Sequence, residues 1–312
     1  MLVVFNANAE TLVLAVPQTE FPALAAQMLD GAKAALKDNW VIKPVDAGCT
    51  AEAAANIGNL ILAERPDAVI GLPCIESLTL ALNVLGPIGV PIVTIASRSE
   101  ALSKLAMNNQ WRLDRMGSRE HEEGEAIAEL LVAAWRELPF AILDDGTIFA
   151  RDTAEAIRNE AETNSVKPVL VDGFQPQLEN QKKLLDRIVS SGATHVFIAG
   201  DRANIAQIAT EAAGLKLIFA GPETLRAADL DIPLPVGVLM AARDSPLDIA
   251  AEGYTTDALV AAEIAMALKA DASLRSFNTS FGTLSAAPDG FMGPVNYALF
   301  TYDGSNFQKA ER

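Results

Sequence analysis

The 312-residue chain is poor in the side chains on which most metal sites depend. It has only two histidines, His121 and His195, and two cysteines, Cys49 and Cys74. Zinc and related metals are usually bound by several such ligands. His195 begins an apolar segment and is interpreted as structural. His121 lies among glutamates that suit the first turn of a helix, where the helix dipole favours acidic groups. We therefore expect no metal site and no cofactor.

Motifs for nucleotide binding and for covalent catalysis are also missing. The sequence contains neither GxGxxG nor GxxxxGK[ST], which predict dinucleotide and phosphate-loop binding. It has no GxSxG nucleophile elbow. No local signature marks Cys49 or Cys74 as a catalytic thiolate. The protein is therefore expected not to be an enzyme.

Basic residues are scarce as well. Lysine and arginine number 24 against 40 acidic residues, which gives a formal net charge of −16. An acidic surface repels phosphate backbones and anionic lipids, so nucleic acid is not an expected partner. No apolar run approaches the roughly 18 residues of a membrane-spanning helix, so membrane insertion is not expected. Half of the residues are apolar, which is typical of a folded chain.

Residues 1–9 differ in character from the rest of the chain. An apolar run, Leu2–Phe5, precedes a small-x-small pattern that ends at Ala9. This pattern is typical of the end of a secretory signal peptide, although an N-terminal strand is an alternative interpretation. Cys49 and Cys74 are either a disulfide or two buried thiols, and export favours the disulfide.

Apolar runs alternate with alanine-rich helical patterns along almost the whole chain. Repeated strand–helix units predict parallel sheets covered by helices on both faces. A polar stretch at 108–119 interrupts the alternation, which predicts two doubly wound lobes. The predicted strands are 11–16, 41–45, 68–71, 91–95, 140–143, 168–171, 195–199, 217–220, 236–240 and 295–301. The predicted helices are 22–36, 51–64, 77–85, 120–135, 152–163, 181–190, 205–213 and 249–269.

Several segments resemble the type I periplasmic solute-binding proteins, specifically the branched-chain amino-acid (leucine/isoleucine/valine) binding family of ABC transporters. The resemblance is carried by DAGCTAEAAANIGNLI and DAVIGLPCIESLTLALNVLGPIGVPIVTIASRSEAL, and it continues in FAILDDGTIFARDTAEAI, GYTTDALVAAEIAMAL and GPVNYALFTYDGSNF. It extends from Glu10 over nearly the whole chain. It implies two Rossmann-like lobes joined by a three-strand hinge. The expected lobes are 10–117 with 247–291, and 118–246 with 292–312.

The resemblance also implies a ligand site on loops that follow strands, between the lobes. In the first lobe the implied ligand-binding residues are Glu76, Ser77, Ala96, Ser97 and Arg98. Helix N-termini and hydroxyl groups are suited to bind a carboxylate. Helix capping is the alternative role of the two serines. Both cysteines, Cys49 and Cys74, fall where some family members have a disulfide.

The second lobe is implied to contribute Phe149, Asp201 and Glu223, with Glu223 accepting an ammonium group of the solute. Arg98, Ile75 and Asp201 depart from the family pattern, which usually has Thr, Ser and an aromatic residue there. The segment between Met240 and Gly253 is shorter than in the family. Arg98 favours a carboxylate through bidentate pairing. The ligand is therefore expected to be a small polar solute, either an amino acid or a small carboxylate.

The sequence thus predicts a monomeric, periplasmic receptor that delivers a small-molecule ligand to the membrane subunits of an ABC importer. Closure about a hinge is the expected mechanism. An envelope or sensory interaction module with the same fold is one alternative, and a cytosolic α/β enzyme is another.

Overall fold

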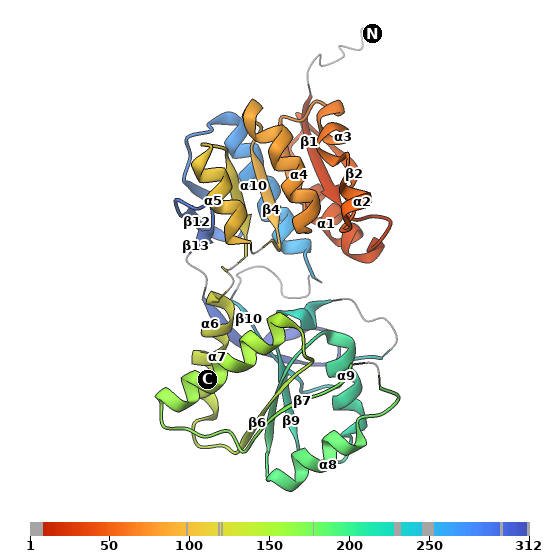
Figure 1. Cartoon of the computed structure of the whole chain (residues 1–312), viewed down its shortest axis with the longest axis vertical. Coiled ribbons are helices and arrows are strands. Elements are labelled where there is room, and N and C mark those ends of the chain that lie inside the picture. The colour runs from red at the N-terminus through yellow and green to blue at the C-terminus, as the bar shows by residue number, and fades with distance from the viewer. Residues whose placement is uncertain are drawn as a thin grey trace. The chain divides into compact units, whose positions relative to one another are not determined.

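A computed structural model describes residues 9–97, 99–117, 119, 121–176, 178–227, 232–244, 253–293 and 296–310. The chain divides into two compact units (Figure 1). The first unit comprises Met1–Arg119 with Tyr254–Pro294, and the second comprises Glu120–Gly253 with Val295–Arg312. The chain therefore passes from one unit to the other three times. The segment interpreted as a signal-peptide remnant lies, except for Ala9, outside the described residues.

The first unit is built on a parallel sheet of order β2-β1-β3-β4-β5. Its strands are β1 Glu10–Val16, β2 Trp40–Asp46, β3 Ala68–Gly71, β4 Ile92–Ile95 and β5 Leu113–Met116. Central strands of this kind are buried on both faces and read as continuous apolar runs. Leu12 to Val16 are all fully buried. This burial explains why β1 shows no polar alternation.

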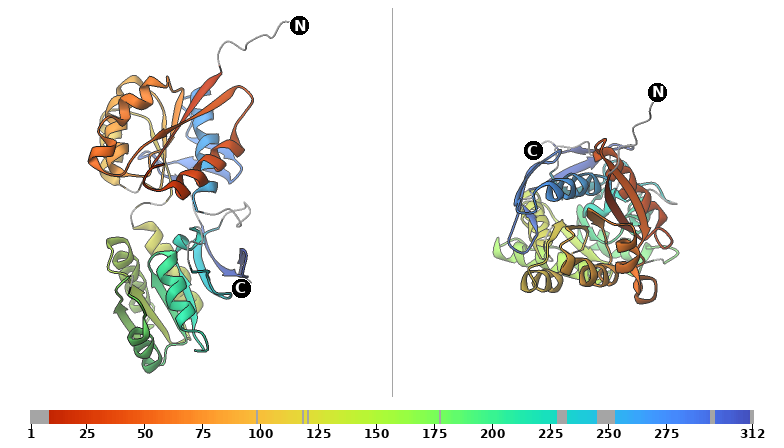
Figure 2. Two further views of the ribbon diagram at one scale, coloured as in Figure 1. Left: turned by 90° about the vertical axis from the view of Figure 1, so that its right-hand side faces the viewer. Right: turned by 90° about the horizontal axis from the view of Figure 1, so that it is seen from above.

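Helices cover both faces of this sheet, as the left view in Figure 2 shows. Val13 and Ala15 share a core cluster with three helices, α3 Ile57–Ala63, α4 Ile75–Leu85 and α5 Glu100–Asn108. Successive side chains of a strand point to opposite faces. Leu12 and Leu14 therefore face the other layer, in which α1 Pro22–Ala35 packs against α10 Thr255–Ala270. The short α2 Ala51–Ala54 and η1 Gly86–Ile88 complete the layer that contains α4.

A small antiparallel sheet of order β11-β12-β13 also belongs to the first unit. Its strands are β11 Ser276–Thr279, β12 Gly282–Ala286 and β13 Met292–Gly293. Gly290, which precedes β13, has φ +86°, and a Cβ there would lie 2.0 Å from the carbonyl oxygen of Leu113. Only glycine permits this close approach. The Gly290 carbonyl accepts a hydrogen bond from the N–H of Arg115 at 2.8 Å, which joins this segment to β5.

The second unit contains a seven-stranded sheet of order β15-β14-β10-β9-β8-β6-β7. Its strands are β6 Phe140–Asp144, β7 Leu170–Gly173, β8 His195–Ala199, β9 Ile218–Gly221, β10 Leu239–Arg243, β14 Tyr297–Tyr302 and β15 Phe307–Lys309. The strands from β6 to β10 are parallel, whereas β14 is antiparallel to β10 and to β15.

Helices also flank both faces of this second sheet. One face packs against α6 Glu122–Trp135 and α7 Ile148–Thr163, and the other against α8 Lys182–Ser191 and α9 Arg202–Glu211. A 3-10 turn, η2 Glu223–Arg226, follows β9. The two units share one strand order, because β7-β6-β8-β9-β10 repeats β2-β1-β3-β4-β5. The predicted fold class, two doubly wound α/β units, is confirmed.

Several local elements differ from the prediction, among them helix α5 and strand β15, which were not predicted. The stretch 108–119 was expected to be irregular but contains β5, although two of its four residues are charged. The small sheet β11-β12-β13 was not predicted. The helix expected at 249–269 is α10, which begins at Thr255, and residues 245–252 lie outside the described residues. In each described unit no helix is long and apolar enough to cross a membrane.

The two cysteines are disulfide-bonded, as expected. Cys49 follows β2 and Cys74 follows β3, and their Cα atoms lie 5.1 Å apart. The N–H of Cys49 also donates to the Glu20 carboxylate at 2.9 Å. The disulfide therefore fixes the loop after β2 to the start of α4.

Reducing this disulfide should lower the free energy of unfolding by roughly 3 kcal/mol, because a cross-link over 25 residues removes loop entropy from the unfolded chain. Urea titrations with and without reductant measure the difference. The double variant Cys49→Ser/Cys74→Ser should reproduce the reduced protein and be insensitive to reductant. Equal midpoints in all samples would contradict the expected role.

Candidate functional site

In open parallel sheets ligands bind beyond the carboxyl ends of the strands. The loops after β3 and β4 supply the candidate residues of the first unit. Glu76 and Ser77 lie in the first turn of α4, where Glu76 is exposed and Ser77 is fully buried. The Ser77 hydroxyl donates to the carbonyl of Cys74 at 3.2 Å. Cys74, not Ser77, is the N-cap of α4.

The loop after β4 contains Ala96 and Ser97. Ala96 adopts the left-handed conformation with φ +68°, which is uncommon for a residue with a Cβ. Ser97 is buried. The Thr94 hydroxyl donates to the Leu72 carbonyl at 2.9 Å and so joins the ends of β3 and β4. Arg98, the fifth candidate of this unit, lies outside the described residues.

A buried arginine on β5 holds this loop in place. The Arg115 guanidinium donates to the carbonyl oxygens of Ser97 at 2.9 Å and Ser99 at 2.8 Å. Its Nε donates to the Ser103 hydroxyl at 2.8 Å. The side chain is fully buried, and burial lowers the pKa of Arg115 to about 10, so it stays protonated at neutral pH. The sequence did not reveal this residue, because it falls in the stretch read as an irregular interruption.

The segment before β13 packs beside this arginine. The Phe291 ring is in cation–π contact with two guanidinium groups, with its centroid 5.2 Å from Arg115 and 5.0 Å from Arg119. Arg119 also forms a two-point ion pair with Asp289, at 2.9 and 3.0 Å. Burial alone would raise the pKa of Asp289, but the hydrogen bonds and charge of Arg119 lower it below its ordinary value.

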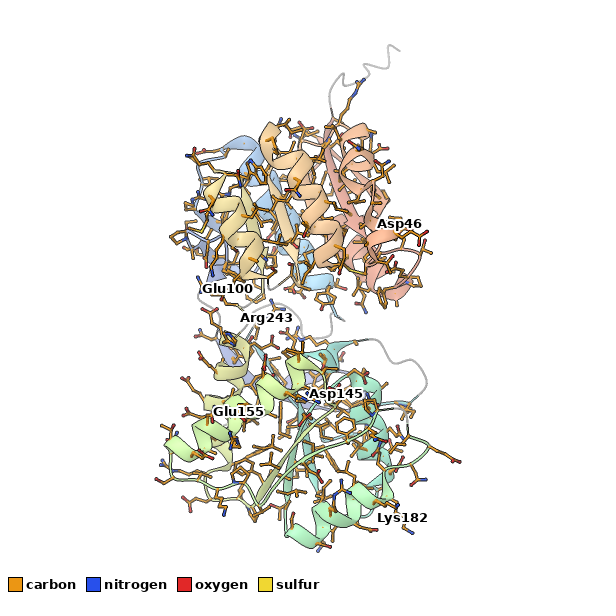
Figure 3. All side chains as sticks on the ribbon, in the orientation of Figure 1. Asp46, Glu100, Asp145, Glu155, Lys182 and Arg243 are labelled. Atoms are coloured by element: carbon orange, nitrogen blue, oxygen red, sulfur yellow. A yellow bond between two sulfur atoms is a disulfide. The ribbon has the colours of Figure 1, made fainter. Side chains whose placement is uncertain are left out.

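In the second unit, polar residues follow four neighbouring parallel strands. Asp145 follows β6, Asp201 follows β8, Glu223 follows β9, and Arg243 ends β10. Asp145 and Arg243 are labelled in Figure 3. Asp201 is exposed and caps α9, accepting the N–H of Asn204 at 2.8 Å. Asp201 is therefore the N-cap of α9, the kind of role that sequence analysis considered for Ser77 and Ser97.

The remaining predicted residues of this unit are Phe149 and Glu223. Phe149 lies in the first turn of α7 and is half-buried. Glu223 is bound by two arginines that the sequence analysis did not select. Arg243 donates to both of its carboxylate oxygens, at 2.8 and 3.2 Å. The Nε of Arg226 lies 3.4 Å from one of the same oxygens.

Neighbouring loops at this edge are tied together. The Thr224 hydroxyl donates to the Gly200 carbonyl at 2.7 Å, which joins the loop after β9 to the loop after β8. The structure thus brings Ser77 and Ser97 to one edge of the first sheet, and Asp201 and Glu223 to one edge of the second. Among the residues described in these units, no cluster of three His, Cys, Asp or Glu side chains is arranged to hold a metal ion.

Comparison with curated proteins gives distant relatives, whereas no protein-family model matches the chain. A Leu/Ile/Val-binding protein of Citrobacter freundii is 24% identical over 188 residues, which are 60% of this chain and 50% of the relative. A Leu/Ile/Val/Thr-binding protein of Salmonella typhimurium is 24% identical over 195 residues, 62% of this chain and 53% of the relative. The matched part of the chain spans about half the length of these curated relatives.

Solved structures are similar over nearly the whole chain. An amino-acid ABC transporter substrate-binding protein of Pseudomonas fluorescens has a TM-score of 0.74 at 12% identity, covering 97% of this chain and 96% of that one. A branched-chain amino-acid transporter substrate-binding protein of Streptococcus pneumoniae, solved with isoleucine, has a TM-score of 0.69 at 13% identity, covering 98% and 100%. The resemblance to the branched-chain amino-acid-binding proteins is confirmed. These similarities in structure show that the chain has the fold of that family.

Replacing Arg115 by methionine should destabilise the first unit by more than about 3 kcal/mol, because buried carbonyl groups lose a charged donor. Arg115→Lys should recover only part of the loss, since an ammonium cannot span Ser97, Ser99 and Ser103 together. Urea denaturation measures both variants. Arg158→Met, on the exposed face of α7, is the control. Equal stability of Arg115→Met and native protein would contradict the assigned role.

The Arg119–Asp289 pair should make stability depend on acid pH. The pKa of Asp289 is lowered in the folded protein, so its contribution is present above the unfolded value of about 3.9 and is lost as pH falls through the folded value. Asp289→Asn should therefore lower the urea midpoint at pH 7 and have a much smaller effect once the pH is below the folded pKa of Asp289. Arg119→Gln should show the same pH dependence. A deficit that is constant with pH would contradict this.

Proposed function

We propose that this protein is the substrate-binding component of an ABC importer, and that it binds a small polar solute without covalent chemistry. The observation that carries the proposal is the combination of two doubly wound units with sequence similarity to Leu/Ile/Val-binding proteins. Parallel sheets of this order bind ligands at their carboxyl edges. Both units have polar side chains at that edge.

The range of relatives supports a solute class wider than branched-chain amino acids. A solute-binding protein of Rhodopseudomonas palustris, solved with 4-hydroxybenzoate, is as similar to this chain as the isoleucine-binding structure, with a TM-score of 0.69 at 15% identity. The structural match covers 97% of this chain and 96% of the chain of that protein. We therefore propose an amino acid or a small carboxylate as the solute.

The proposed ligand-binding residues are those selected from the sequence. They are Glu76, Ser77, Ala96, Ser97 and Arg98 from the first unit, and Phe149, Asp201 and Glu223 from the second. In this proposal the solute contacts both sets, and its binding energy favours a closed arrangement of the units over an open one. The proposed partners are the membrane subunits of the importer. The proposed location is the periplasm, which the protein reaches by means of a signal peptide. The receptor is proposed to be a monomer.

A thermal-shift screen against amino acids and small carboxylates tests the proposal. A solute at about 100 times its Kd should stabilise the protein by roughly 2.7 kcal/mol, and the shift should grow with concentration. Titration calorimetry then gives the affinity and a stoichiometry of one. An interaction module that binds no small solute would show no shift with any of these compounds.

Variants test the site itself. Arg98→Ala should weaken a carboxylate solute by about tenfold, because a charge-assisted hydrogen bond is lost. Asp248→Asn, a matched change in charge outside the proposed set, should leave the affinity within about twofold. Equal affinities of native protein and Arg98→Ala would remove Arg98 from the site.

A further inference from the structure

The second unit carries a small cluster of charges, Glu223, Arg226 and Arg243, where β9 and β10 end. The strands pair Leu239 with Ala220 and Met240 with Gly221. Continuing this register places Ala242 level with Glu223, which lies two residues beyond the end of β9. Arg243 follows directly, and its guanidinium donates to the Glu223 carboxylate. The cluster therefore lies at the carboxyl edge of two adjacent parallel strands, where doubly wound sheets bind ligands.

Glu223 in this cluster is poorly suited to accept an ammonium group. Both of its carboxylate oxygens accept hydrogen bonds from Arg243, and one also lies 3.4 Å from the Nε of Arg226. An ammonium that reached this carboxylate would approach two guanidinium groups at the same time. The repulsion from two cations outweighs the attraction of one anion at similar distances. The acid that family resemblance assigns to an ammonium is here the counter-ion of two arginines.

The Glu223 carboxylate lies close to the Arg226 guanidinium but leaves one of its buried donors without a hydrogen bond. The Arg226 side chain is 5% exposed, and its Nε has no hydrogen-bond partner despite being buried. A buried cation is costly unless it is paired and hydrogen-bonded. The Arg226 Nη2 donates to the Arg243 carbonyl at 3.5 Å, so among the described residues it is the Nε that remains a buried donor which a further acceptor would satisfy.

The cluster remains accessible from solvent through its two other members. The side chains of Arg243 and Glu223 are 13% and 18% exposed. A guanidinium presents a planar set of donors that matches a carboxylate at two points. Arg243 can therefore donate to a bound carboxylate while Glu223 holds its orientation.

We propose that this cluster is a carboxylate-recognition subsite, in which Arg243 donates to the solute, Arg226 provides fixed positive charge and Glu223 orients both arginines. The proposal rests on the proposed function and narrows it, because the second unit then selects an anionic group and not an ammonium. Solutes that carry a carboxylate without an amino group fall within this class.

Matched probes separate the two kinds of recognition. Leucine carries both groups, isocaproate lacks the amino group of leucine, and isoamylamine lacks its carboxylate. Benzoate and benzylamine form a second pair. Calorimetry with native protein should show binding of at least one carboxylate, and at least tenfold weaker binding of the matching amine. Binding of an amine as tight as its matching carboxylate would overturn the inference and leave the proposed function standing. No binding of any probe would overturn both.

The sign of the Glu223→Gln effect is the sharper test. Glutamine keeps an oxygen that accepts from Arg243 but lacks the negative charge. Glu223→Gln should therefore tighten carboxylate binding, whereas an ammonium acceptor would lose at least tenfold. Arg243→Gln should weaken the carboxylate by at least tenfold. Glu155→Gln and Arg158→Gln alter an exposed ion pair on α7 and serve as controls. Circular dichroism and thermal unfolding establish that each variant is folded.

Two outcomes would overturn the subsite directly. One is a folded Arg243→Gln protein with native carboxylate affinity, which would make the cluster purely structural. The other is a folded Glu223→Gln protein whose carboxylate affinity falls tenfold or more. If Arg226→Gln does not fold, the pair of Glu223 and Arg243 variants still decides the question.

Discussion

The first unit depends on the burial of one cation, the Arg115 guanidinium. Neutral acceptors satisfy it, namely the carbonyl groups of Ser97 and Ser99 and the hydroxyl of Ser103. A buried charge of this kind is tolerated only while its acceptors stay in position. The loop after β4, helix α5 and the segment before β13 are therefore stabilised together. A residue that is fully buried thus sets the geometry of the loop that contains Ala96 and Ser97.

This dependence explains which parts of the fold the sequence could predict. Strand β3 and the part of β1 from Leu12 onward are apolar, because both of their faces are covered, and this pattern is sufficient to predict them. Strand β5 contains Asp114 and Arg115, which are equally buried but need partners far away in sequence. Burial raises the pKa of Asp114, and Arg112, which hydrogen-bonds it, acts in the opposite direction. Arg112 also donates to the carbonyl of Leu274, 162 residues away. A local sequence pattern cannot predict a contact between residues this far apart in the chain.

In the candidate site, too, the sequence could predict some residues but not the distant residues that contact them. Ser77, Asp201 and Glu223 could be selected because the resemblance to the binding-protein family implies ligand contacts on segments that follow strands. Their partners could not, since the contact between Glu223 and Arg243 results from the register of β10 against β9. The chemical meaning of Glu223 depends on this contact, because a free carboxylate binds cations and one that is held by two arginines does not. Position along the chain selected Glu223 as a candidate, but the contact with Arg243 on the neighbouring strand determines the charge around it.

The positions of the buried arginines bear on the charge of the cluster formed by Glu223, Arg226 and Arg243. Among the described residues, the basic side chains that are more than nine-tenths buried are Arg115, Arg202 and Arg226. Arg115 lies one residue from the carboxyl end of β5, Arg202 is the first residue of α9 after β8, and Arg226 is the last residue of η2 after β9. The whole chain carries a net charge of −16, which repels anions at long range. At physiological ionic strength that repulsion is screened beyond about 8 Å, whereas charges in a partly buried site are screened much less. In the proposed subsite, anion selectivity arises from local guanidinium groups at the carboxyl edge of the sheet, and it is compatible with an acidic protein.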